Sequence, residues 1–331
     1  MNVVRPLTQK SLNFSMNHQV SSPMSRAMGR PSGRVLVTGA CGQIGTELVE
    51  ALQKKHGLES VIATDIHKGE ACRVLDVMDK IEIQRLVVEE EITEIYHLAA
   101  LLSATGEKNP ELCWNINVIG LKNVIDVAKK NNARLFSPSS IAVFGPDCPN
   151  IAPQITPLNP TTVYGKTKVV GEQLAITSGI DMRGIRYPGL ISYKAPAGGG
   201  TTDYAVEIFH HATKNGKYEC FVREDTKLPM MYMDDAIRAT IELMDYPVEQ
   251  LSEARGGYNI SGCSFTVGEL VKSIQRHIPD FTCTFNPDVR QTYADSWPDE
   301  IEDDVAKKEW GWKPSFDLDG IVDEMITNLE Y

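Results

Sequence analysis

The chain has 331 residues, and its 33 lysines and arginines against 44 aspartates and glutamates leave a net charge of −11. This balance excludes a general nucleic-acid-binding protein, which needs a basic face to displace counterions. Hydrophobic residues make up 42% and charged residues 23%, as in a globular protein rather than a disordered chain. No apolar stretch approaches the roughly 18 to 20 residues of a membrane-spanning helix. We therefore expect neither a nucleic-acid nor a membrane partner.

Cysteine usage argues against a disulfide framework and against a zinc site. The count is odd, no Cys-x-x-Cys pair occurs, and no cysteine–histidine cluster is present. We expect reduced thiols and no bound metal at the seven positions, which are Cys41, Cys72, Cys113, Cys148, Cys220, Cys263 and Cys283.

Residues 1–33 differ in composition from the rest of the chain. They contain basic residues and several serines, and the first acidic residue of the protein is Glu47. A basic, acid-free start of this kind is typical of a mitochondrial transit peptide, and a disordered tail without a targeting role is the alternative. The sequence thus predicts a disordered leader over 1–33, a fold that begins near Arg34, and a mitochondrial location.

From Arg34 to about residue 190, short apolar runs alternate with helical patterns. The predicted strands are 34–38, 60–65, 71–76, 94–98, 133–137 and 182–187. The predicted helices are 42–56, 80–90, 110–131 and 162–177. This alternation is typical of right-handed βαβ units. We expect an α/β fold with a Rossmann-type doubly wound parallel sheet, in which residues 34–190 form the dinucleotide-binding domain.

The alternation weakens after residue 188. Three glycines in 195–200 predict a loop, because glycine holds regular elements poorly. Helical patterns follow at 204–213, 234–244, 266–277 and 318–328. We expect residues 191–331 to form mainly a smaller carboxy-terminal substrate-binding lobe, with some return to the sheet.

A glycine-rich turn joins the first predicted strand to the first predicted helix. Gly39, Gly42 and Gly45 let the backbone turn tightly and approach a pyrophosphate, and Gln43 and Ile44 then present the helix N-terminus. The order of strand, turn and helix makes this spacing more specific than a bare glycine triplet.

An acid stands at the place that selects the dinucleotide. Asp65 ends the second strand, twenty residues after Gly45. A carboxylate there accepts hydrogen bonds from the ribose hydroxyls and repels the extra phosphate of NADP, so NAD is the expected cofactor. The alternative is an aspartate that only caps a turn. Asp76 and Val77 end the third strand and are candidate contacts to the adenine ring.

The carboxyl ends of two further strands should meet at the same crevice, because ligands of parallel sheets gather there. Leu98, Ala99 and Ala100 follow one strand and leave room for a cofactor. His97 before them fits a core histidine better than a ligand. Ser139-Ser140 follows the next strand.

A tyrosine and a lysine share one face of the predicted helix 162–177. Tyr164 and Lys168 are four residues apart, and Ser140 lies twenty-four residues before the tyrosine. A free phenol has a pKa near 10, and a close cation favours its ionised form. Each residue alone fits a solvated helix face or a turn; their joint spacing behind a dinucleotide loop favours catalysis.

Together these segments resemble the extended short-chain dehydrogenase/reductases, a superfamily that includes nucleotide-sugar epimerases and dehydratases. The resemblance runs from Arg34 to the carboxyl terminus. Within the superfamily, several later segments resemble the L-threonine 3-dehydrogenases that do not use zinc. These segments are 138–145, 186–192, 198–205, 294–298 and 310–314.

The resemblance implies NAD-dependent oxidation of L-threonine to 2-amino-3-oxobutyrate. It implies Tyr164 as the general base, Lys168 as the group that lowers its pKa and holds the nicotinamide ribose, and Ser140 as the group that orients the substrate oxygen. Asn117 is expected to support a water or the Lys168 head, and Tyr187 to adjoin the cofactor. A homodimer formed through helices 110–131 and 162–177 is also implied.

Threonine is a zwitterion, so its pocket needs both donors and acceptors. Candidate substrate contacts are Ser103, Gly199 and Thr202, with Trp297 closing over the methyl group. The glycine loop would act as a lid.

Two other functions stay open at this point. A nucleotide-sugar epimerase or dehydratase would need arginines clustered for a diphosphate, and none is obvious in the carboxy-terminal half. A regulator that binds NAD(H) without catalysing a reaction could lose Tyr164 or Lys168. Both residues are present, which disfavours this alternative.

Overall fold

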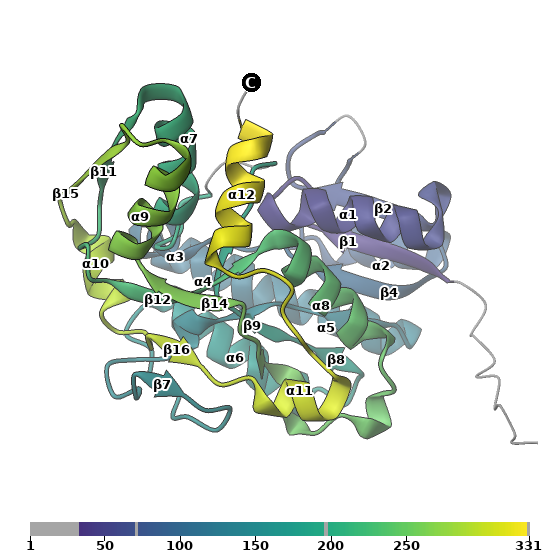
Figure 1. Cartoon of the computed structure of the whole chain (residues 1–331). Coiled ribbons are helices and arrows are strands. Elements are labelled where there is room, and N and C mark those ends of the chain that lie inside the picture. Colours follow the sequence, from purple (N-terminus) through teal and green to yellow (C-terminus); the bar gives the residue numbers. More distant parts are fainter. Residues whose placement is uncertain (1–32, 70–71, 195–197, 330–331) are drawn as a thin grey trace, which may run out of the picture. The chain divides into compact units, whose positions relative to one another are not determined.

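A parallel sheet forms the centre of the structure, a computed structural model that describes residues 33–69, 72–194 and 198–329. Residues 32–331 cluster as one compact unit. The six parallel strands lie in the spatial order β3 (Arg73–Val74), β2 (Val61–Asp65), β1 (Arg34–Thr38), β4 (Ile92–His97), β5 (Arg134–Phe136) and β8 (Met182–Arg183). Figure 1 labels β2, β1, β4 and β8 of this sheet. The order reverses at β1, which confirms the predicted doubly wound fold. The predicted leader up to residue 32 and residues 195–197 of the predicted loop lie outside the described residues.

Helices cover both faces of this sheet because successive strand residues point to opposite sides. Val35 and Val37 of β1 pack in one apolar cluster with α1 (Gln43–His56) and α8 (Met233–Asp245). Leu36, between them, packs in another cluster. That second cluster is built from α2 (Lys80–Glu89), α5 (Leu121–Asn131), and Ala175 of α6 (Val163–Thr177).

The sheet continues past two interruptions. Pro138, which has no N–H to donate, separates β5 from β6 (Ser139–Ser140), and Gly184 separates β8 from β9 (Ile185–Tyr187). A Cβ on Gly184 would lie 2.7 Å from the carbonyl oxygens of Ser137 and Gly256, so only glycine fits there. Beyond the break, β6 pairs with β9, and β9 pairs with β13 (Tyr258–Asn259).

The predicted helix 110–131 has a break in its regular winding. The structure divides it into α4 (Pro110–Trp114), a π-helical turn at Asn115–Gly120, and α5. Such π turns occur inside α-helices and are frequent at functional sites. A short helix that was not predicted, α3 (Ser103–Lys108), precedes α4.

The second half of the chain mixes short strands with the predicted helices. β10 (Gly189–Ile191), β12 (Lys227–Tyr232) and β14 (Cys263–Thr266) form one small sheet. Two more pairs join β11 (Lys217–Cys220) to β15 (Thr282–Phe285), and β16 (Glu300–Ile301) to β7 (Ile151–Ala152). The remaining helices are α7 (Tyr204–Asn215), α9 (Val267–His277), α10 (Val289–Ala294), α11 (Asp304–Trp310) and α12 (Leu318–Leu329). These strands are two to six residues long, too short for a period-2 pattern to reveal most of them.

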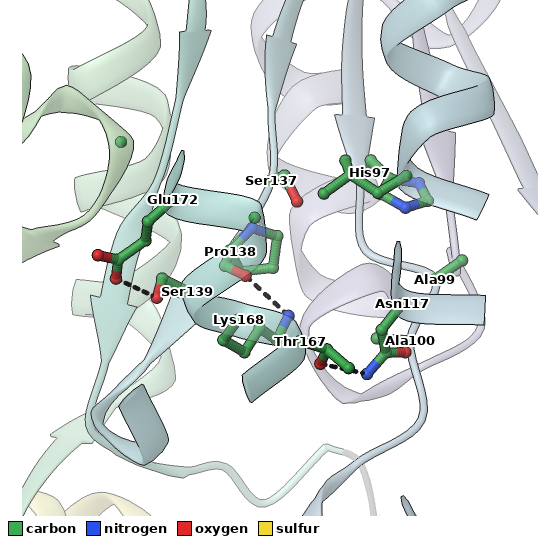
Figure 2. A pocket seen from close by; sticks show the side chains of 13 residues that line it. His97, Ala99, Ala100, Asn117, Ser137, Pro138, Ser139, Thr167, Lys168 and Glu172 are labelled. Carbon is green, nitrogen blue, oxygen red and sulfur yellow. Dashed lines mark hydrogen bonds between the residues drawn. The ribbon is translucent and has the colours of Figure 1, made fainter. Parts of the chain in front are cut away.

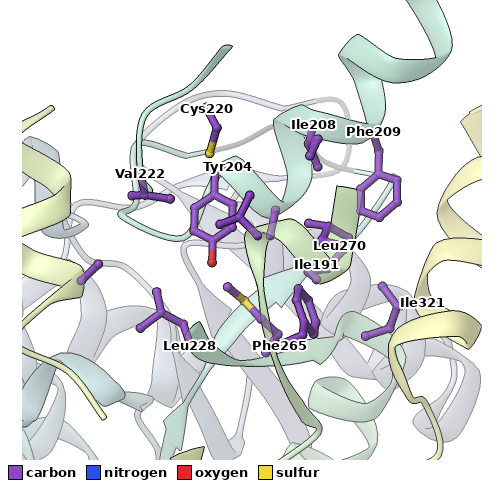
Figure 3. Packing of buried hydrophobic residues seen from close by; sticks show 14 of the residues in the cluster. Ile191, Tyr204, Ile208, Phe209, Cys220, Val222, Leu228, Phe265, Leu270 and Ile321 are labelled. Atoms are coloured by element: carbon purple, nitrogen blue, oxygen red, sulfur yellow. The ribbon is translucent and has the colours of Figure 1, made fainter. Parts of the chain in front are cut away.

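A separate apolar cluster supports this half. Figure 3 shows Tyr204, Phe209, Phe265 and Leu270 packed around one another, and each is buried. Tyr164 and the 3₁₀ turn Ile141–Val143 belong to the same cluster. The cluster therefore ties the tyrosine of the predicted site to the carboxy-terminal elements. Among the described residues, no helix has the length and apolar character to cross a bilayer.

Candidate active site

The glycine-rich turn after β1 is closely packed against the next strand end. Gly39 has a φ of +71°, and a Cβ there would lie 2.6 Å from the backbone nitrogen of Ala99. A Cβ on Gly45 would lie 2.2 Å from the Gly39 carbonyl oxygen. α1 starts at Gln43 without a side-chain cap, so no capping side chain occupies the first N–H groups at the positive end of the helix. The turn thus has the shape and polarity of a phosphate cradle.

The two predicted adenosine contacts have different environments. Asp65 lies at the end of β2, and its carboxylate accepts hydrogen bonds from the backbone N–H groups of Cys41 and His67, each at 3.1 Å. A carboxylate offers about four acceptor positions, which leaves room for ribose hydroxyls. Asp76 is exposed, whereas Val77 is buried beside Gly120 of the π turn.

A cavity of ≈ 140 Å³ lies between the glycine turn and the second half of the chain. It brings together most of the residues that the sequence nominated for catalysis and for the nicotinamide and substrate ends. These are Gln43, Ile44, Leu98, Ala100, Ser103, Ser140, Tyr164, Lys168, Tyr187, Thr202 and Trp297. The side-chain nitrogen of Gln43 is buried and has no hydrogen-bond partner in the described part of the chain, so a polar ligand group would satisfy it. Cradle, acid and orphaned amide together fit a dinucleotide.

Burial dominates the ionisation of the central pair. Tyr164 is 9% exposed, and burial raises the pKa of its phenol to about 12, although the hydroxyl of Ser140 acts in the opposite direction. Burial lowers the pKa of Lys168 to about 8. The Lys168 nitrogen lies 5.5 Å from the centre of the Tyr164 ring. Burial is the largest cause of the Tyr164 shift, and the expectation that Lys168 lowers the phenol pKa stays a prediction.

Behind Lys168 lies a second, smaller cavity of ≈ 20 Å³, which has room for one water molecule. In Figure 2 the Lys168 nitrogen points at the Pro138 carbonyl, to which it donates a hydrogen bond of 2.7 Å. Asn117 lines the same cavity but bonds to the backbone of Leu101 and to the Thr167 hydroxyl. Asn117 therefore holds the loop after β4, and its expected role toward a water or the Lys168 head stays a prediction.

His97 also lines this small cavity. Its ring pairs with the Thr38 hydroxyl at 2.9 Å, and burial lowers its pKa to about 3, with Lys168 adding to the effect. The side chain is thus a neutral histidine of the protein interior, as the sequence suggested.

The glycine loop is organised by an acid that sequence reasoning did not nominate. Asp203 accepts hydrogen bonds of 2.7 Å from the N–H groups of Gly199 and Gly200, and it lines the main cavity. The Gly199 amide, which was expected to meet the substrate, therefore donates to Asp203 in this structure. The Thr201 and Ser103 hydroxyls lie 3.3 Å apart across the cavity wall. The sequence does indicate a role for Asp203, because an acid that follows a glycine–threonine run and precedes a helix can accept hydrogen bonds from nearby backbone N–H groups.

A buried ion pair supports the serine strand. Glu172 lies on the same helix as Lys168 and accepts two hydrogen bonds of 2.8 Å from the guanidinium of Arg186. The same carboxylate accepts a 2.5 Å hydrogen bond from Ser139, the neighbour of Ser140. The pair therefore links α6 to β6 and β9 beside the smaller cavity, which Glu172 and Ser139 line.

Comparison with known proteins identifies the family. The sequence profile described as "NAD dependent epimerase/dehydratase family" matches residues 35–261, which is more than half of the chain. The chain belongs to this family. The family description names NAD as the dinucleotide, in agreement with the acid at Asp65.

Several similar proteins within the family are threonine dehydrogenases by name. The mitochondrial L-threonine 3-dehydrogenase of Bos taurus is 46% identical over 307 residues, covering 89% of this chain and 82% of that protein. A solved monomeric L-threonine 3-dehydrogenase from a metagenome is 55% identical with a TM-score of 0.87, covering 89% of this chain and 98% of the other. The holo form of an L-threonine dehydrogenase from Cupriavidus necator is 48% identical with a TM-score of 0.87, covering 89% and 99%.

Proposed function

We propose that this protein oxidises the 3-hydroxyl of L-threonine with NAD⁺, giving 2-amino-3-oxobutyrate. The observation that carries the proposal is the main cavity, where Tyr164, Ser140 and Lys168 meet within a space of ≈ 140 Å³. NAD supplies the hydride acceptor when it is bound. The named similarity to threonine dehydrogenases supports the choice of substrate.

Tyr164 acts as the general base at its phenol oxygen. Its pKa of about 12 makes the neutral phenol the resting form, so ionisation requires added positive charge or a strong donor beside the oxygen. Ser140 supplies a donor, and its hydroxyl also holds the substrate oxygen for proton transfer. Lys168 contributes its charge in the protonated form, which its pKa of about 8 preserves at neutral pH.

The opposite wall of the cavity suits an amino acid. Hydroxyls of Ser103, Thr201 and Thr202 can donate to the substrate carboxylate, and the Asp203 carboxylate can accept from the ammonium group. Trp297 closes the cavity beside them and would cover the methyl group. The lining contains no arginine among the residues that the structure describes, which disfavours a diphosphate-bearing sugar nucleotide.

The proposal also covers the division of the chain, its location and its oligomeric state. Residues 34–190 serve mainly the dinucleotide and residues 191–331 mainly the substrate. The basic leader directs the protein to mitochondria, in line with the name of the bovine relative.

A homodimer through α4, the π turn and α6 is favoured by apolar side chains that these elements expose. The exposed side chains are Leu112, Trp114, Ile119 and Ile176. One similar structure is named monomeric, so sedimentation or size-exclusion measurements decide this last point.

Absorbance at 340 nm tests the reaction directly. Purified protein with NAD⁺ should form NADH when L-threonine is added and should form none with a UDP-sugar. The Tyr164→Phe variant should bind NADH normally and turn over at least a hundredfold more slowly, the usual range for loss of a general base (~10²–10⁴). Sugar epimerisation without net NADH release would replace the proposal with the epimerase alternative.

A further inference from the structure

Two cysteine side chains meet at the adenosine end of the dinucleotide turn. Cys41 lies inside the turn, between Gly39 and Gly42, and Cys72 precedes β3. Their sulfur atoms are 3.0 Å apart, although the residues are 31 positions apart in the sequence. A disulfide bond is about 2.05 Å long, so the two sulfurs are only about 1 Å from bonding distance.

The backbone around Gly69 allows this approach. The Cys72 N–H donates a hydrogen bond of 3.4 Å to the Gly69 carbonyl. A Cβ on Gly69 would lie 3.1 Å from the Cys41 sulfur and 3.1 Å from the Cys72 Cβ, tighter than ordinary packing. The missing side chain therefore leaves the space in which the two sulfurs meet.

The two thiols differ in access to solvent. Cys41 is exposed, whereas Cys72 is partly buried, and burial followed by the contact with Cys41 raises the Cys72 pKa to about 12. An oxidant in solution therefore meets Cys41 first, and Cys72 is placed to resolve the product.

The pair also adjoins the acid of the dinucleotide site, because the Cys41 N–H donates to Asp65 at 3.1 Å. We propose that Cys41 and Cys72 form a reversible disulfide that weakens dinucleotide binding at Asp65. This inference rests on the proposed NAD site. It goes beyond the reaction itself, since it makes the affinity for the cofactor depend on the thiol–disulfide state of the surroundings.

The oxidant is a low-molecular-weight disulfide, such as glutathione disulfide. The Cys41 thiolate attacks one of its sulfurs, and a mixed disulfide forms while one thiolate leaves. The Cys72 thiol gives up its proton and attacks the Cys41 sulfur, and the second small thiolate leaves; the two leaving thiolates take up the protons that Cys41 and Cys72 released. One protein disulfide and two small thiols result, so the two electrons lost by the cysteines reduce the small disulfide.

Bond formation has a cost at the neighbouring acid. The Cys41 N–H holds one oxygen of the Asp65 carboxylate, so a shift of Cys41 toward Cys72 changes how that carboxylate is presented to the ribose. Loss of one hydrogen bond between this carboxylate and a ribose hydroxyl corresponds to about a tenfold weaker affinity. The dissociation constant for NADH should rise by about this factor on oxidation and should return on treatment with dithiothreitol.

The experiment uses the full chain, reduced and then incubated with glutathione disulfide. Intact mass after alkylation counts free thiols, disulfide mapping locates the bond, and NADH fluorescence gives the dissociation constant. The wild type should lose two of its seven free thiols, and the bond should join Cys41 to Cys72. Cys72→Ser should form no internal bond and should stop at a Cys41–glutathione mixed disulfide, which adds one glutathione to the intact mass. In its reduced form this variant should bind NADH as the wild type does. Cys283→Ser, a control of comparable exposure, should behave as the wild type.

Three results would overturn the inference: seven free thiols after oxidation, a disulfide between other cysteines, or a Cys41–Cys72 bond with unchanged NADH affinity. NADH binding is measured without threonine. A reduced protein that binds NADH but does not oxidise threonine would therefore refute the proposed reaction and leave this test intact.

Discussion

Replacing Lys168 with methionine is expected to make the protein more stable at pH 7 and catalytically inactive. The lysine is half-buried on α6, in the wall of both cavities. Burial of the ammonium group in that position lowers the free energy of unfolding. Its function is to place a positive charge beside Tyr164. Methionine has a similar length and no charge, so it fills the same space without the penalty.

The magnitude follows from the shifted ionisation of the lysine. The drop in the Lys168 pKa from 10.5 to about 8 amounts to roughly 3 kcal/mol against the charged form. The hydrogen bond from Lys168 to the Pro138 carbonyl is lost in the variant, which costs about 1 to 3 kcal/mol if that oxygen stays unpaired. We expect a net gain of up to about 2 kcal/mol in the free energy of unfolding.

The sign of the pH dependence provides an independent check. Between pH 8 and pH 10.5 the unfolded state keeps the proton that folded Lys168 has lost, so the wild-type protein gains stability as the pH rises through this window. The methionine variant lacks this gain. Its advantage is therefore full below pH 8 and should disappear by about pH 10.5.

Urea unfolding followed by tryptophan fluorescence at pH 7 and at pH 10 measures both effects. Lys166→Met is the matched control, because Lys166 is exposed on the same helix two residues away. The control should leave stability nearly unchanged and should retain NADH formation. A Lys168→Met protein whose stability relative to the control stays the same from pH 7 to pH 10 would refute the reasoning that burial sets the lysine pKa.

Three further substitutions address the cofactor, the substrate and the support of the site. Glu172→Ala leaves the buried Arg186 guanidinium without its carboxylate, and urea unfolding should show a loss of about 3 to 5 kcal/mol; a loss below 1 kcal/mol would contradict the burial of the pair. Asp65→Ala should raise the KM for NAD about tenfold and reduce discrimination against NADP in steady-state kinetics, whereas an unchanged KM would place the ribose elsewhere. Trp297→Ala should raise the KM for threonine about fourfold, because the methyl group of threonine would stay in water at a cost of ~0.8 kcal/mol. An equal rise in the KM for serine, which lacks this methyl group, would argue against contact between Trp297 and the methyl group.

Local patterns in the sequence were sufficient for the scaffold and for much of the cofactor site. The predicted strand 34–38 is β1, and the turn after it needs glycine because of a positive φ at Gly39 and close backbone contacts at Gly45. Tyr164 and Lys168 share a face because they lie four apart on one helix. Each of these features depends on neighbours in the sequence, through backbone angles or the helical period.

Features that depend on contacts between distant segments were not visible in the sequence. The Glu172–Arg186 pair needs α6 packed on β9, and the Cys41–Cys72 contact needs the glycine turn packed on the segment before β3. Asp203 occupies the amides that were expected to meet the substrate. Burial, which no local pattern measures, raises the pKa of Tyr164 and lowers that of Lys168. Ionisation is a property of the whole fold, because desolvation is produced by every segment that covers a side chain.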